Sequence, residues 1–452
     1  MSSPGRIRAV LIVLSLATVT TAFTSFQPLC TAPTSAVSYV AIPNSRGTIE
    51  IVWACVFAIF ACTWTVHHPN LPRQRRKGRR GWGENMKCDL RDFWESTKLA
   101  FYTIIAPEAI VSVACSELLS AYWILGEHGI HCDEPLNDSD SWTISEIQFA
   151  NMGGFTTLVE GETPGKAGTL YHLTAFEILN MWEEGRLLKG LPRIDLDELY
   201  DRSKCDFFVK TLSVAEILWS VLQVLIRVAR NLVVSPLELA VLAFSACACI
   251  TYALYWMKPK NVYTTIHVPL ASPQLVPAAD LARYRQHNEV HIVREFLLPP
   301  IGCMKAQMHH VRPAGDPLCS VTSLRIPRGS HYANVVPRIA GYFAAALFGG
   351  IHAAAWQFPF PSATELCAWR CATIYTAIYG PITFSQDLLL RRHRTVQKSV
   401  FCVLTWLYVI ARLVIISEMV RTMFYLPTES FMPTWVPEWT THRHVWAGTR
   451  PS

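Results

Sequence analysis

Apolar residues in this chain form long runs that are separated by short polar and charged stretches. The clearest example lies between residues 209 and 257, where two apolar runs flank a short basic bend at residues 227–231. Each run holds about 20 residues, which at about 1.5 Å per residue is enough to cross the roughly 30 Å hydrocarbon core of a bilayer. The pattern therefore predicts a transmembrane helical hairpin at the centre of the chain.

The same pattern predicts further spans on both sides of this hairpin. Ile49–Val66 is one apolar run, and three more fall between residues 335 and 425, the first of them rich in the small residues that permit close helix packing. Two weaker runs, Lys98–Leu125 and Ile144–Val159, either both cross the membrane or both dip into it and return. The predicted fold class is all-α, a polytopic helical membrane protein with about five to seven transmembrane helices and small cytosolic segments.

Polar stretches, prolines and charges define the other boundaries. Residues 1–22 are predicted to form a signal peptide, because two arginines precede a short apolar run; a retained signal anchor is the alternative. The expected order is then a lumenal segment (23–47), a first span with an imperfect helical pair (48–160), a cytosolic helical segment (161–208), the central hairpin (209–257), a cytosolic segment rich in Pro, His and Arg (258–334), a three-span bundle (335–425) and an irregular tail (426–452).

Clustered basic residues predict the orientation in the membrane. Residues 73–80 read RQRRKGRR, and further basic residues occur in 258–334 and 391–394. Short loops rich in Lys and Arg stay on the cytosolic side. All three basic blocks lie on the same side of the membrane only if an even number of spans separates each from the next. A topology in which 98–125 crosses without 144–159 would place two of the blocks in the lumen, and it is therefore rejected.

Composition agrees with a membrane protein and narrows the partners. The chain has 452 residues, of which 51% are hydrophobic and 16% charged, with a net charge of +6. Soluble proteins carry about 25% charged residues. The modest charge, confined to blocks between apolar runs, favours an anionic bilayer surface over nucleic acid. The expected partners are the lipid bilayer and a lipophilic small molecule; oligomeric state is not encoded in this pattern.

Ionisable residues inside apolar runs are the candidates for chemistry, because burying them in lipid is unfavourable. Glu108 follows Pro107, and a carboxylate beside a proline break can bind a cation or act as a general acid or base; a local kink is the alternative interpretation. Glu216 and Gln223 fall on one helical stripe with two arginines. Arg412 lies within the last span and requires a carboxylate, for which Glu108 or Glu216 is predicted.

Other polar residues complete the predicted site. Asn151, Gly153 and Gly154 are candidates for substrate binding, because glycine allows a backbone or a ligand to approach closely. Together with Glu108, Glu216, Gln223 and Arg412, Asn151 is expected to line a groove open to the cytosol. Glu418 and Arg421, three residues apart, are expected to pair. The sequon at Asn137 predicts N-glycosylation on a lumenal loop.

Known catalytic signatures are missing from the sequence. It holds no P-loop, HExxH, dinucleotide-binding glycine motif or aspartate-rich diphosphate-binding motif, and its 14 cysteines do not occur in zinc-binding pairs. We therefore expect no cofactor and no metal, and an ATP-driven pump or a conventional metalloprotease is disfavoured.

Five short stretches resemble a family of uncharacterised multi-pass membrane proteins found widely in filamentous fungi. They are Arg46–Trp53, Phe149–Phe155, Asp201–Lys204, Trp256–Asn261 and Ala411–Pro427, the last at its two ends. The resemblance spans nearly the whole chain. It implies a protein of the endoplasmic reticulum or another endomembrane, and some members lie among secondary-metabolite biosynthetic genes.

Three classes of function follow from these observations. The first is an accessory or membrane-embedded biosynthetic protein for a lipophilic fungal metabolite, such as a terpenoid or polyketide. The second is a transporter or channel for a small metabolite or ion, and the third is a scaffold without catalysis. The sequence does not decide whether the protein is an enzyme. The first two classes predict a polar cavity near the middle of the membrane, whereas the third predicts a close-packed bundle with paired charges.

Overall fold

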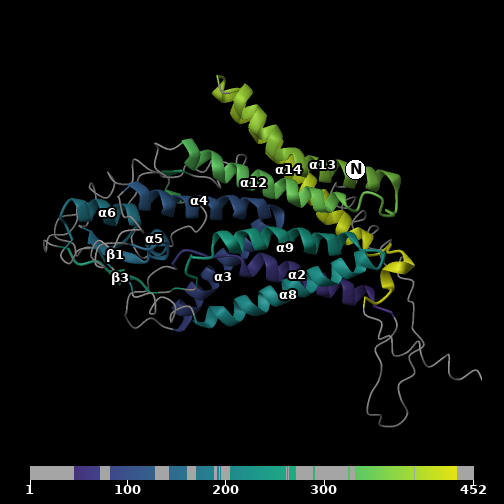
Figure 1. Ribbon diagram of the computed structural model, residues 1–452, viewed down its shortest axis with the longest axis horizontal. Coiled ribbons are helices and arrows are strands. Elements are labelled where there is room, and N and C mark those ends of the chain that lie inside the picture. The colour runs from purple at the N-terminus through teal and green to yellow at the C-terminus, as the bar shows by residue number, and fades with distance from the viewer. Residues whose placement is uncertain are drawn as a thin grey trace, which may run out of the picture.

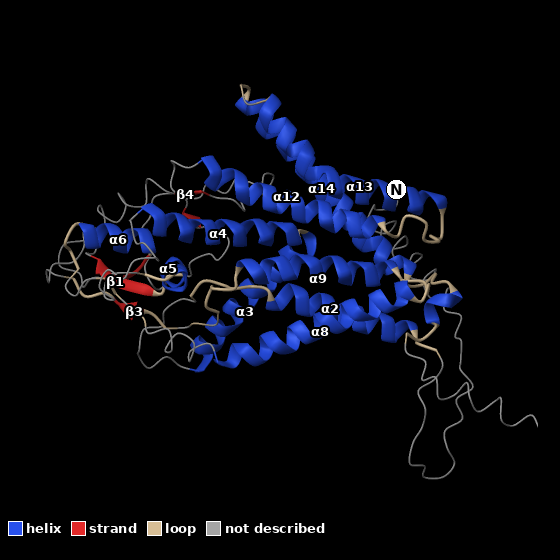
Figure 2. Cartoon of the chain, in the orientation of Figure 1, coloured by secondary structure: helices blue, strands red, loops and turns tan. Residues whose placement is uncertain are grey.

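The computed structural model of the chain is a long bundle of helices with a small mixed module at one end (Figure 1). It describes residues 45–71, 82–127, 142–159, 169–187, 191–192, 194, 204–260, 262, 264–270, 289–290, 324–325, 331–390 and 392–434. The predicted signal peptide, Asn137 and the last residues of the tail lie outside this part of the chain. Within it the fold is mostly helical, as Figure 2 shows, which confirms the all-α prediction.

Eight long helices build the bundle. They are α2 (Thr48–Thr65), α3 (Trp82–Ile105), α4 (Pro107–Glu127), α8 (Lys204–Ala229), α9 (Pro236–Leu254), α12 (His331–Ala353), α13 (Ala363–Leu389) and α14 (Arg394–Thr422). A short 3₁₀ helix, η1 (Thr428–Phe431), follows α14. Among the described residues, five stretches are long and apolar enough to cross a membrane, as expected for a multi-pass protein: Thr48–Thr65, Pro107–Gly126, Pro236–Leu254, Val335–Ala353 and Thr395–Thr422.

Local sequence explains where the central hairpin turns. Ser235 caps α9: its hydroxyl accepts from the Glu238 backbone N–H at 3.3 Å, and the Glu238 carboxylate accepts from the Ser235 N–H at 2.8 Å. Pro236 occupies the first helical position, where its missing N–H is not needed. This capping box starts α9 after the bend that ends α8.

Small residues set the packing of α12. A methyl group added at Gly349 would lie 2.6 Å from the backbone nitrogen of Ala377 on α13, and one at Gly341 would lie 3.1 Å from Cβ of Ser112 on α4. The Ser112 hydroxyl donates to the Pro337 carbonyl at 2.8 Å. These contacts place α12 directly between α4 and α13.

The module at one end of the bundle contains helices α5 (Ile144–Asn151) and α6 (Ala175–Glu183) and strands β1 (Phe155–Val159), β2 (Thr169–Leu173) and β3 (Ile266–His267). Strand β1 pairs antiparallel with β2 and parallel with β3. The module has its own core, in which Trp142, Phe149 and Phe155 pack ring against ring. Strands β4 (Glu289–Val290) and β5 (Leu324–Arg325) pair separately.

The alternative in which Ile144–Val159 crosses the membrane is wrong. Helix α5 has eight residues, about 12 Å, and Gly153 turns the chain with φ 88° before it becomes a β-strand. The segment 161–208 also differs from the helical prediction, since Thr169–Leu173 is a strand and helix α6 spans only Ala175–Glu183. Short apolar runs rich in β-branched residues can form either a helix or a strand, and here β1 is a strand paired with β2 and β3.

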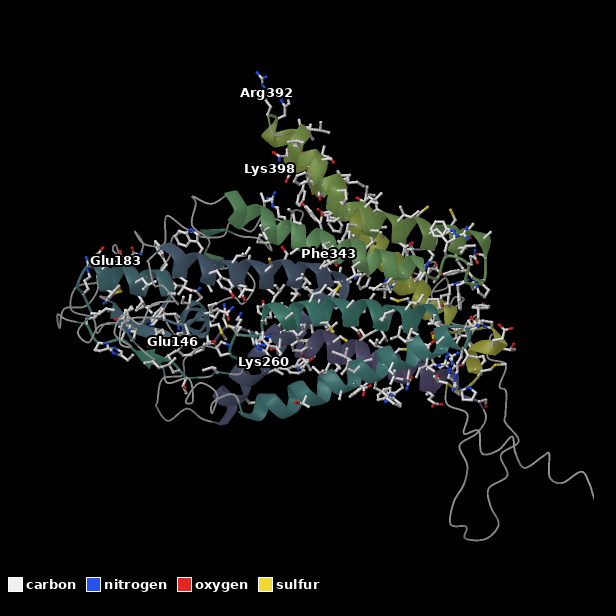
Figure 3. The ribbon with its side chains drawn as sticks, in the orientation of Figure 1. Glu146, Glu183, Lys260, Phe343, Arg392 and Lys398 are labelled. Atoms are coloured by element: carbon white, nitrogen blue, oxygen red, sulfur yellow. The ribbon has the colours of Figure 1, made fainter. Side chains whose placement is uncertain are left out.

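Contacts between helices define two opposite ends of the bundle. At the module end, Lys258 pairs with Glu117 at 2.6 Å and Lys260 donates to the Thr65 carbonyl at 2.6 Å; Figure 3 shows Lys260 on the side of the bundle that faces the module. At the other end, which we call the clamp end, Arg46 pairs with Glu238 at 2.6 Å. Helices α2, α8, α9 and α12 run between these two ends (Figure 1), whereas α13 and α14 diverge from them toward Arg392, away from the module (Figure 3).

The α3–α4 pair starts and finishes at the module end. Helix α3 crosses the module end of α2, where Thr103 contacts His67 at 2.9 Å. The helix is interrupted at Ala106, between the end of α3 at Ile105 and the start of α4 at Pro107. Helix α4 then runs beside α12 and reaches the module end at Glu117. Only about 15 Å of α4, from Pro107 to Glu117, therefore lies inside the bundle. Pro107–Gly126 within α4 is nevertheless long and apolar enough to cross a membrane.

Candidate functional site

Glu108 occupies the first turn of α4, directly after the break between α3 and α4. Its side chain is completely buried. The Tyr408 hydroxyl of α14 donates a hydrogen bond to Glu108 Oε1. Glu108 Oε2 has no hydrogen-bond partner among the described residues. Burying a carboxylate oxygen without a hydrogen bond is unfavourable unless a water, an ion or a ligand binds to that oxygen.

Arg412 lies one turn after Tyr408 on the same face of α14, because residues four apart are neighbours on a helix. Its Nε donates to the Ile105 carbonyl at 2.7 Å, and its Nη2 contacts the Ile104 carbonyl at 3.4 Å. These carbonyls belong to the last turn of α3, which lacks partners within the helix. Arg412 thus caps α3 at the point where the chain breaks, and its Nη1 is buried without a partner in the described structure.

Arg412 and Glu108 attract each other without forming a direct ion pair. The positive charge of Arg412 acts on the Glu108 carboxyl group. No nitrogen of Arg412 lies within 4.0 Å of a Glu108 oxygen in the described part of the chain, so the two form no direct ion pair. Of the two carboxylates predicted to compensate Arg412, Glu108 and Glu216, Glu108 is the one on which Arg412 acts. Tyr408 fills the position between them and was missed in the sequence, because tyrosine is common in membrane spans.

Phe348 of α12 connects this pair to His352 and Trp369. The Arg412 guanidinium lies 3.6 Å from the centroid of the Phe348 ring, and the His352 ring stacks on Phe348 at 4.4 Å. Trp369 packs beside His352 with ring centroids 5.8 Å apart. His352 Nε2 and Trp369 Nε1 are also buried without partners among the described residues. Arg412 and His352, each with one unpartnered buried nitrogen in the described structure, therefore lie on the same aromatic ring.

A small cavity lies beside the break at Pro107. Its volume is about 10 Å³, and its lining includes Thr63, Thr103, Pro107, Cys247 and Thr251. This volume is close to the minimum that holds one water molecule. The cavity lies toward the module end, where Thr103 contacts His67, so it connects the break to the polar residues of that end.

Two of the buried titratable groups at the module end are His67 and Tyr255. Burial, together with the charge of Lys260, lowers the pKa of His67 to about 3. Burial, together with the neighbouring Glu117 carboxylate, raises the pKa of Tyr255 well above its usual value. Both groups are therefore neutral near pH 7, and the charge at this end comes from Lys258, Lys260 and Glu117.

Glu216 and Gln223 do not join Glu108 and Arg412. Both are half-buried on α8, which packs against α2 and α9, whereas Glu108 lies between α4, α12 and α14 (Figure 1). Arg227, on the same stripe of α8, is completely buried at the clamp end, where it donates to the Val233 and Met432 carbonyls at 2.6 and 2.8 Å. The predicted common groove is thus divided, because a stripe on one helix does not reveal which neighbour it faces.

Asn151, Gly153 and Gly154 lie in the module and have structural roles there. Asn151 Oδ1 accepts from the Ala175 N–H at 3.2 Å at the start of α6, and the Gly153 carbonyl lies 2.7 Å from His172 Nδ1. A methyl group at Gly154 would clash with the Phe149 ring. Helix α5 packs on α4 near Ala121, about 20 Å along that helix from Glu108. These residues are therefore separated from Glu108.

The expected Glu418–Arg421 pair does not form. Arg421 Nε instead contacts Glu365 Oε1 of α13 at 2.6 Å, and Glu418 Oε2 has no partner in the described structure. Spacing along one helix permitted the pair, but the neighbouring helix supplies a better-placed carboxylate. No group of three or more His, Cys, Asp or Glu residues within the described ranges is arranged to hold a metal ion.

Comparison with known proteins gives one match. Residues 18–276, more than half of the chain, match a family of unknown function designated DUF8562. The matched range includes α2 to β3 and therefore Glu108, whereas Tyr408, Arg412 and His352 follow it. No curated protein and no solved structure matches the chain. The chain belongs to the family of unknown function DUF8562.

Proposed function

We propose that this multi-pass membrane protein binds a lipophilic small molecule at the cluster formed by Glu108, Tyr408, Arg412 and His352, as an accessory or biosynthetic protein of an endomembrane. The observation that carries the proposal is the pair of unpartnered, buried atoms Glu108 Oε2 and Arg412 Nη1. An unmet hydrogen bond is unfavourable in such a buried region, so a bound ligand or water would stabilise both atoms.

The arrangement suits a ligand that both donates and accepts hydrogen bonds. Glu108 Oε2 can accept from a hydroxyl group, and Arg412 Nη1 can donate to a carbonyl oxygen of the same molecule. Phe348 and Trp369 are buried against His352, and the cavity beside Pro107 holds about one water, so a lipophilic molecule would enter only if α4, α12 and α14 separate. If the protein is catalytic, Glu108 is the general acid or base and Arg412 stabilises negative charge on the oxygen.

Transport is the second candidate function, and the break at Ala106–Pro107 favours it. Transporters often bind substrates where a helix is interrupted near the middle of the membrane, because the interrupted ends expose backbone groups. Here, however, Arg412 already occupies the carbonyls at the end of α3. The unpartnered atoms belong to side chains, which favours binding of a ligand over release of backbone groups to an ion.

The test is the replacement of the gene by variants in the cells that carry it, followed by untargeted metabolite profiling. Glu108→Gln and Arg412→Ala are expected to reproduce the profile of a deletion while protein level and localisation stay unchanged. Glu216→Gln, which changes a half-buried carboxylate on α8, is the matched control and should leave the profile intact. Mass spectrometry of compounds that copurify with the wild-type protein, but not with Glu108→Gln, would identify the ligand.

Two outcomes would contradict the proposal. If both variants retain the wild-type profile and bind the same compounds, the cluster is not the working centre. If deletion changes no metabolite but releases other proteins from the membrane, the protein is a scaffold. Loss of the variants from the membrane calls for Tyr408→Phe, which removes only one hydroxyl group and should still impair ligand binding.

A further inference from the structure

Helix α3 carries a stripe of exposed apolar side chains that no other described element covers. Met86, Leu90, Phe93, Trp94 and Phe101 are 51%, 66%, 58%, 60% and 59% exposed. At 100° per residue these five positions fall within about 100° of arc, so they form one face of the helix. A soluble surface rarely carries such a continuous apolar face.

This stripe continues the surface by which α2 faces lipid. The Phe93 ring lies 5.9 Å from the Trp64 ring, which stacks on Phe60 at 5.5 Å. Phe60 is 53% exposed on α2, a helix apolar enough to span a membrane. Trp64 stands one residue before the end of that helix, at the level where aromatic residues gather at membrane–water interfaces.

The charge of the chain beside α3 indicates which lipids fit. Residues 73–80, which precede α3 in the sequence, read RQRRKGRR and include six basic residues. A basic segment next to an amphipathic helix is the composition that binds anionic lipid headgroups. Because this basic segment directly precedes α3 in the sequence, a phospholipid surface is a more suitable occupant of the stripe than a second protein.

We propose that α3 is an in-plane membrane helix whose exposed stripe inserts at the module-end surface of the bilayer and binds anionic phospholipids there. This role is separate from the Glu108 cluster. It anchors α3, and α3 in turn presents its last carbonyls to Arg412.

The experiment measures hydrogen exchange of residues 82–101 in the full-length protein, reconstituted in nanodiscs of phosphatidylcholine alone or with 30% phosphatidylserine, on the order of the anionic content of a cytosolic leaflet. We expect exchange to be at least about tenfold slower with phosphatidylserine, and the difference to disappear at about 0.5 M salt. Leu90→Ser with Trp94→Ser should speed exchange in both bilayers. Both side chains are exposed, so the change leaves internal packing intact.

The matched control is Leu388→Ser with Leu389→Ser, which changes two exposed leucines at the end of α13 and should not affect exchange of α3. Exchange that is independent of phosphatidylserine and of the stripe variants would overturn the proposal. Protection that instead depends on two copies per nanodisc would identify the stripe as a contact between copies, and would also overturn it. Neither result bears on the metabolite test of the Glu108 cluster.

Discussion

The hydrogen bond from Tyr408 to Glu108 is expected to be one of the strongest side-chain contacts inside the bundle. Glu108 is completely buried, and Tyr408 is 3% exposed. A buried hydrogen bond to a charged group contributes about 1.5–3 kcal/mol, and removal of one partner leaves the other without compensation. Tyr408→Phe should therefore reduce the free energy of unfolding by about 2 kcal/mol.

A double-mutant cycle separates this contact from general packing. Glu108→Met removes the carboxylate at similar volume, and the variant with both changes loses the two partners together. We expect a coupling energy of about 1.5–3 kcal/mol, so that the double variant is hardly less stable than Tyr408→Phe alone. The measurement is unfolding by sodium dodecyl sulfate in mixed micelles, followed by circular dichroism.

Tyr379 supplies the matched control for this cycle. Its ring lies 4.5 Å from that of Tyr408 in the same cluster, but its hydroxyl contacts Thr405 at 3.0 Å. The cycle of Tyr379→Phe with Glu108→Met should give a coupling below about 0.5 kcal/mol. A similarly small coupling for Tyr408 would refute the reasoning, because it would mean that Glu108 does not depend on this hydroxyl.

Three further predictions follow from packing, pH and topology. Gly349→Ala should destabilise the protein by about 1–3 kcal/mol, because the added methyl group would clash with the backbone of α13. Gly350→Ala, which adds a methyl group in open space, should not destabilise the protein. Equal effects of the two changes would contradict the close packing of α12 on α13. Since His67 has a folded pKa of about 3 and an ordinary value of 6.5, the stability from its neutral form is complete above pH 6.5 and is lost as pH falls toward 3. Wild type should therefore lose about 2 kcal/mol between pH 6.5 and pH 5 that His67→Asn does not lose in the same unfolding assay; parallel pH profiles would refute this. If the module end is cytosolic, Asn137 should carry no glycan, because the described residues on both sides of it lie at that end. A shift of the protein on a gel after glycosidase treatment would exclude this orientation.

The long helices could be predicted from the sequence because their signal is local. Length and hydropathy of a run decide whether a helix can cross a bilayer, and neither depends on distant residues. Glu108 and Arg412 stood out for the same reason, as charges within apolar runs. Their neighbourhood also followed in outline, since buried charges of opposite sign tend to be placed together.

The parts that could not be predicted depend on which elements become neighbours. Tyr408 has no distinguishing sequence signal, and only the packing of α14 on α4 brings its hydroxyl to Glu108. Glu216 satisfied the same local criterion as Glu108 but faces another helix. Arg421 found Glu365 on α13 instead of Glu418 on its own helix. Strand β1 pairs along its whole length with β2 and also with β3, which lies more than 100 residues later in the chain.

The contacts that Arg227 makes at the clamp end join parts of the chain that are synthesised at different times. Arg227 donates to the carbonyls of Met432 and Ser430, which follow it by 205 and 203 residues. At about 5–20 residues per second, a ribosome needs roughly 10 to 40 s to translate that stretch. During this interval Arg227 has only the Val233 carbonyl and the more distant Glu238, 3.9 Å away, as partners. The contacts of Arg227 at the clamp end are therefore completed only after the last helices have been made. A premature stop before Ser430 would leave the buried Arg227 side chain without the Ser430 and Met432 carbonyls, a defect that cellular quality control could recognise.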